Sequence, residues 1–161
     1  MERWADFYVA EVGAAAALAG LLFVAISFNI EKILAFPHLP ARAAQTLIII
    51  GGSLTLAGFG LFPTITQHQF GVVAIVIAVT LLIVGTRSYL RNRSASGPNA
   101  KRLWALSQLT TDVVAALPMA AGGLLLTHGS EIGLSVIGVA IILCFVATMH
   151  SGWVLLVEIL R

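Results

Sequence analysis

Two ionisable side chains, Asp112 and His150, lie inside long apolar stretches of this sequence. Asp112 follows Arg102 by ten residues and His150 precedes Arg161 by eleven, so in helices both lie roughly 15 Å from a basic end. An ionisable group at that depth in a membrane usually faces a partner inside the helix bundle. We therefore expect the two side chains to meet, and a carboxyl–imidazole pair can exchange a proton.

Polar residues near this pair extend the predicted site. Gln108 precedes Asp112 by one helical turn, Thr111 adjoins it, and Ser151 follows His150. Glu11 lies early in the first apolar stretch. The predicted ion or proton pathway therefore consists of Asp112, His150, Gln108, Thr111, Ser151 and Glu11. The alternative is a hydrogen bond between Asp112 and His150 that only fixes how two helices pack.

Metal and cofactor chemistry finds little support in the sequence. We predict no metal and no cofactor; the alternative metal set is Glu11 with His68 and His128, which are ligands that suit zinc. No second histidine matches the predicted depth of His150, which disfavours a bis-histidine haem. The nucleotide-binding, CxxC and HExxH motifs are absent, and this favours a function other than catalysis.

The composition indicates that lipid surrounds much of this chain. Of its 161 residues, 59% are hydrophobic and 10% are charged, whereas soluble domains carry about 25% charged residues. So much apolar surface cannot be buried in one small core. The basic residues lie at the ends of apolar runs, so the net charge of +2 predicts membrane topology and not nucleic-acid binding.

The apolar runs predict an all-α polytopic membrane protein with a single transmembrane domain over residues 1–161. Residues 43–86 carry no formal charge, and they exceed twice the roughly 20 residues that one span needs. A polar break at residues 63–69 divides this stretch in two. The five predicted transmembrane helices cover residues 4–34, 41–62, 70–90, 103–127 and 132–160. A polar, basic loop is predicted over residues 91–102.

Lysine and arginine positions predict the orientation, because cytoplasmic loops are enriched in these residues. If the loop 91–102 is cytoplasmic, eight of the nine basic residues lie on that side, and Arg3 alone lies outside. We therefore predict an external N-terminus and a cytoplasmic C-terminus.

Small residues on several helices predict close helix packing, which in lipid depends on backbone approach and hydrogen bonds. The first helix carries Gly13 and Gly20, the second Gly52 and Gly60, and the fourth the pair at residues 122–123. Some of these positions are free to serve association between chains. The predicted partners are the lipid bilayer and either further copies of the chain or other membrane proteins.

Residues 7–27, FYVAEVGAAAALAGLLFVAIS, and the segment LPARA at residues 39–43 resemble small uncharacterised multi-pass proteins of the bacterial inner membrane. Some of those proteins carry an automatic label as modulators of a membrane-bound AAA protease. The resemblance covers about a quarter of the chain. It implies a location in the bacterial inner membrane and no catalytic residue.

Three functions remain open at this point. The first is a channel or transporter for protons or cations, with Asp112 and His150 as its polar centre. The second is a non-catalytic subunit or regulator that binds another membrane protein through helix–helix contacts. The third is a membrane enzyme that handles a lipid or quinone between its helices.

Overall fold

The computed structural model describes residues 4–36, 39–93 and 100–159, with backbone alone for 91–93, 100–108 and 158–159. These residues form six helices. Their bounds are α1 Ala5–Phe28, α2 Ile30–Ala35, α3 Leu39–Gly60, α4 Gln67–Arg93, α5 Ala100–Thr127 and α6 Ile132–Ile159. All except α2 are long and apolar enough to cross a membrane. The predicted all-α architecture with five such helices is therefore confirmed.

Local sequence explains where several helices begin and end. Pro40 is the second residue of α3, where a missing N–H costs nothing. Before α4, the Gln69 N–H bonds the Thr66 hydroxyl at 3.2 Å and the Gln69 side chain accepts the Thr66 N–H at 3.0 Å. This reciprocal pair caps the helix. After α5, Gly129 has φ of 80°, a conformation in which glycine commonly ends a helix.

Two predicted boundaries differ from the structure. The predicted helix over residues 4–34 is interrupted at Asn29, which separates α1 from α2. The Asn29 side chain donates to the Ala25 carbonyl at 2.9 Å, a local bond that competes with helix continuation. The predicted loop over residues 91–102 is helical at both ends, because α4 continues to Arg93 and α5 begins at Ala100. Residues 94–99 lie outside the described part.

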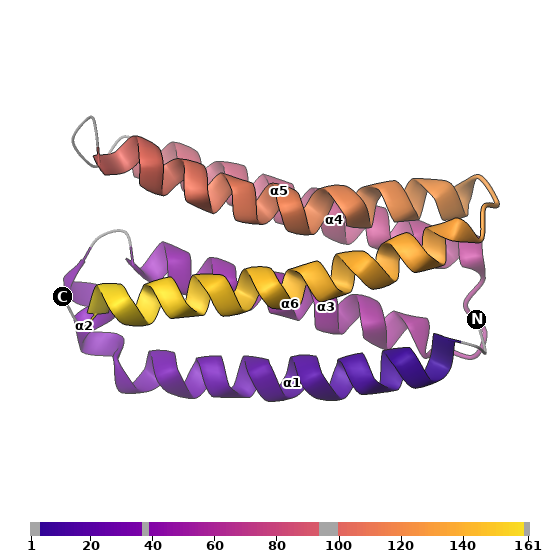
Figure 1. The fold of residues 1–161 in the computed structure, drawn as a ribbon, viewed down its shortest axis with the longest axis horizontal. Helices are drawn as coiled ribbons and strands as arrows, with labels where there is room; N and C mark the ends of the chain where they lie inside the picture. Colours follow the sequence, from indigo (N-terminus) through magenta and orange to yellow (C-terminus); the bar gives the residue numbers. More distant parts are fainter. Residues whose placement is uncertain (1–3, 37–38, 94–99, 160–161) are drawn as a thin grey trace.

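The helices run side by side, with α3 and α6 in the middle, α1 along one side and the α4–α5 pair along the other (Figure 1). Helix α3 packs against α1, α4 and α6, and α5 packs against α4 and α6. The N-terminus lies at one end of the bundle, and α2 lies at the other. We call the half nearest the N-terminus the amino half and the half nearest α2 the basic half.

The name of the basic half reflects its charges. The described helix segments at this end carry seven of the chain's lysines and arginines: Lys32, Arg42, Arg87, Arg91, Arg93, Lys101 and Arg102. The predicted clustering of these residues at one end of the bundle is confirmed for this set. Arg3 and Arg161 lie outside the described residues.

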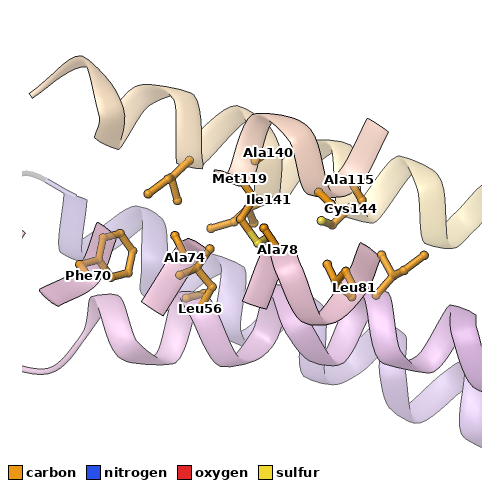
Figure 2. Packing of buried hydrophobic residues seen from close by; sticks show 14 of the residues in the cluster. Leu56, Phe70, Ala74, Ala78, Leu81, Ala115, Met119, Ala140, Ile141 and Cys144 are labelled. Carbon is orange, nitrogen blue, oxygen red and sulfur yellow. The ribbon is translucent and has the colours of Figure 1, made fainter. Parts of the chain in front are cut away.

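An apolar core lies between α3, α4, α5 and α6, with Leu56, Ala78, Met119 and Ile141 among its buried residues (Figure 2). Alanine is frequent in this core, so the helices approach closely. The result is a narrow, well-filled interior in the amino half.

Glycines make the closest helix contacts. A Cβ built on Gly71 of α4 would lie 2.7 Å from the Gly123 carbonyl oxygen of α5, and the reverse distance is 2.6 Å. Gly122 of α5 and Gly133 of α6 meet in the same way. The predicted packing role of residues 122–123 is confirmed. The prediction is wrong within the chain for Gly13 and Gly20 of α1, whose Cβ positions have no neighbour within 4 Å.

Candidate functional site

Asp112 is a buried carboxyl group held between three helices. It lies on α5 with 2% of its surface exposed. Its Oδ2 accepts a hydrogen bond from the Gln45 side-chain amide of α3, which is also buried. Helices α3 and α5 have few other contacts, so this bond connects two elements that α4 and α6 otherwise separate.

Gly85 of α4 makes room for this carboxyl group. A Cβ on Gly85 would lie 2.7 Å from the Asp112 Cγ and closer still to Oδ2. Any other residue at position 85 would therefore displace the carboxyl group or push α4 away. The side chain of Asp112 lies directly against the backbone of α4 because Gly85 has no side chain.

A small polar cavity lies beside this pair. Its lining residues come from α3, α5 and α6, and they are Arg42, Gln45, Thr46, Ile49, Thr111 and Ser151. The cavity offers about 10 Å³ to the centre of a water-sized sphere, close to the space that one water molecule needs. Its walls carry enough donors and acceptors to hold such a water.

One face of α3 supplies most of the polar wall. Arg42, Gln45, Thr46 and Ser53 recur at helical spacing, and all four are buried. The Thr46 hydroxyl donates to the Arg42 carbonyl at 2.9 Å. As a basic residue at the end of an apolar run, Arg42 is predicted to serve membrane topology, yet its side chain is only 4% exposed. The missed signal is the polar stripe on an otherwise apolar helix, which usually faces the bundle interior.

His150 does not join Asp112. Its side chain is exposed, whereas Ser151, the next residue of α6, is buried and lines the cavity. Successive residues of a helix point about 100° apart, so the turn that brings Ser151 inward directs His150 outward. Asp112 and His150 do lie at a similar level along the bundle, because their sequence neighbours Thr111 and Ser151 line the same cavity. The expected contact between the carboxyl and imidazole groups is not formed, and Gln45 takes the place of His150 as the partner.

The other predicted pathway residues divide into two groups. Thr111 lines the cavity, and Gln108 lies one turn before Asp112 on α5, with its side chain outside the described part. Glu11 lies on α1, the helix on the far side of α3 from α4 and α5 (Figure 1). Its buried Oε2 has no hydrogen-bond partner among the described residues, and the same is true of the Tyr8 hydroxyl.

The alternative metal set is not assembled. His68 at the start of α4 and His128 after α5 are both exposed, and Glu11 is partly buried on α1. Among the described residues, no group of three or more histidine, cysteine, aspartate or glutamate side chains is placed to hold a metal ion. Glu11, His68 and His128 are therefore not brought together within this chain.

The site holds one acidic group beside hydroxyl and amide groups. Asp112 can hold or release a proton, and the hydroxyl and amide groups of the cavity can relay one through a bound water. Arg42 carries a permanent positive charge on the cavity wall, which repels a metal cation and favours a carboxylate nearby. The arrangement thus favours a proton over a larger cation.

Comparison with known proteins gives no match: no family model, no curated protein and no solved structure matches this chain.

Proposed function

We propose that this protein is a small membrane transport protein that moves protons through a polar centre formed by Asp112 and Gln45. The observation that carries the proposal is the burial of Asp112 near the middle of α5, whose segment Leu109–Thr127 is long and apolar enough to span a membrane. Acidic residues at such positions are costly, and they commonly mark proton relays in pumps and transporters.

The basic half supports a route to this carboxyl group. Arg42 is the fourth residue of α3, and its side chain lines the same cavity as Gln45, whose amide binds Asp112. A water in that cavity would connect the site toward the basic end, and the Arg42 charge would offset a carboxylate when the proton leaves. In this conformation, Asp112 exchanges its proton with the basic side.

The amino half supplies the barrier that a transport protein needs. Beyond Asp112 the buried residues of α5 carry no proton-transferring side chain, and they are Ala115, Ala116, Met119, Gly122, Gly123 and Leu126. The backbone contact between Gly71 and Gly123 then closes the bundle. Release of the proton to the amino side requires α4 and α5 to separate. Proton release is therefore coupled to a conformational change.

The proposed location is the inner membrane of a bacterium, with the N-terminus outside and the C-terminus in the cytoplasm. The grouping of lysines and arginines at the basic end supports this orientation. Single cysteines at His128 and Leu34, which lie at opposite ends, test it with a thiol reagent that does not cross membranes. In intact cells stripped of any outer membrane, H128C should react and L34C should not; the reverse pattern contradicts the orientation.

Proton flux into vesicles tests the function. The purified chain is reconstituted with a pH-sensitive dye inside, and an imposed pH gradient or potential drives proton movement. Asp112→Asn keeps the size and the hydrogen-bonding capacity of the side chain but cannot carry the proton. We expect the flux to fall by at least roughly tenfold, because general acid–base groups typically contribute that much or more.

Asp6→Asn is the matched control, because Asp6 is an exposed acid in the first turn of α1. It should leave the flux unchanged. A wild-type chain that moves neither protons nor common cations contradicts the proposal. That result would favour the alternative, a subunit or regulator that acts by binding another membrane protein.

A further inference from the structure

His150 lies on an exposed face of α6 that is otherwise apolar from Val139 to Leu156. Val146 and Trp153, one turn before and after it, are 59% and 68% exposed. His150 lies roughly 10 Å along the helix axis from Val157, the last residue of the apolar stretch. A polar side chain at that depth that faces only acyl chains has no hydrogen-bond partner, which is costly.

Other exposed polar groups on the apolar helices satisfy themselves. Ser27, Thr55 and Thr80 each donate a hydrogen bond of 2.8 Å to the backbone carbonyl four residues earlier. The described residues provide no hydrogen bond to His150. Within the described part of the chain, this side chain is therefore left without a partner.

The surrounding face has the spacing of a helix-pairing surface. Its large exposed side chains recur alternately three and four residues apart, and they are Val139, Ile142, Val146, Met149, Trp153 and Leu156. Helices that pack lengthwise on each other use this period. We call this set, together with His150, the α6 face.

We infer that the α6 face binds the α6 face of a second copy of this chain, with the two His150 side chains hydrogen-bonded to each other. A two-fold axis parallel to the helices brings equivalent residues of two copies to the same depth. A neutral imidazole carries one donor and one acceptor, so the group is complementary to itself at that depth. A single polar residue in an apolar helix interface also selects register and partner number.

Disulfide cross-linking in vesicles locates the interface. The wild-type chain is the background, because its single cysteine, Cys144, is buried and should not cross-link. We expect Val146→Cys and His150→Cys to form dimers on mild oxidation. The controls at similar depth are Leu21→Cys on α1 and Ile83→Cys on α4, which are exposed on other faces and should stay monomeric.

Cross-links that form equally at all four positions, at neither α6 position, or only on α1 or α4 would overturn the inference. The first result indicates random collision, and the others indicate a different face or a monomer.

A second measurement tests the hydrogen bond itself. Energy transfer between two fluorescently labelled populations, diluted stepwise with lipid, gives the dissociation constant of the dimer. His150→Leu should weaken association about 3- to 20-fold, the range expected for an interhelical hydrogen bond in a membrane. His150→Gln, which keeps a donor and an acceptor, should restore most of the affinity. Unchanged or tighter association of the leucine variant, or no association in the wild type, overturns the inference.

Discussion

The amino and basic halves of this bundle are held together by different kinds of contact. In the amino half, Gly71 and Gly123 bring the backbones of α4 and α5 together, and the surrounding core is apolar. In the basic half, a hydrogen bond from Gln45 to Asp112 connects α3 and α5 across a small polar cavity. In the amino half α5 is joined to α4 by close van der Waals packing, and in the basic half it is joined to α3 by polar groups. A separate apolar cluster of Ile33, Leu39, Ala43 and Leu155 packs α2, α3 and α6 together in the basic half.

This difference matters because apolar helices in lipid are not driven together by water. Backbone contact at glycines has one good geometry, since any shift either opens a gap or makes a clash. A hydrogen bond between Asp112 and Gln45 can instead be exchanged for one to a water or a proton donor. The amino half is therefore suited to form a rigid seal, and the polar groups of the basic half are suited to change their hydrogen-bond partners.

The largest expected effect comes from filling the backbone contact of the amino half. Gly123→Leu places a side chain where even a Cβ atom would lie only 2.6 Å from the Gly71 carbonyl oxygen. Because α4 and α5 must separate, we expect a loss of about 3 kcal/mol or more in stability. Thermal unfolding of the purified protein in detergent measures this loss, with the fraction folded at each temperature read from the gel-filtration profile.

Gly20→Leu is the matched control for this substitution. The Cβ position at Gly20 of α1 has no neighbour within 4 Å, so the same change should alter stability by less than about 1 kcal/mol. Equal destabilisation at the two positions would show that the glycine contact does not distinguish the amino half.

The sequence was sufficient to predict the five apolar helices and the depth of their polar groups. Depth follows from counting residues at 1.5 Å each from a charged end, and small errors in the start point change it little. This is why Asp112 and His150 were expected at a common level. The structure has Asp112 bonded to Gln45 and Ser151, the residue after His150, beside that same Gln45.

The direction in which a side chain points is far more sensitive. A change of one residue rotates it by about 100°, so Ser151 faces the cavity and His150 faces outward. The sequence alone also does not say which helices are neighbours. Gln45 therefore could not be identified as the partner of Asp112, although its place on a polar stripe of α3 was visible. Counting residues along the chain also could not distinguish Gly123, which contacts the backbone of α4, from Gly20, whose Cβ position has no neighbour.

A smaller effect is expected from filling the space beside Asp112 in the basic half. Gly85→Ala adds one methyl group where the Asp112 carboxyl group lies, and we expect a net cost of about 1–2 kcal/mol after the gain in helix propensity. The same unfolding assay measures the cost, and Gly51→Ala, whose Cβ position is open, is the control. If the methyl group acts through the carboxyl group, Gly85→Ala should cost much less in an Asp112→Ala background, so the two changes are non-additive. A cost that persists without the carboxyl group would mean that α4 and α5 are joined by backbone packing here too, and the two halves would then differ in degree and not in kind.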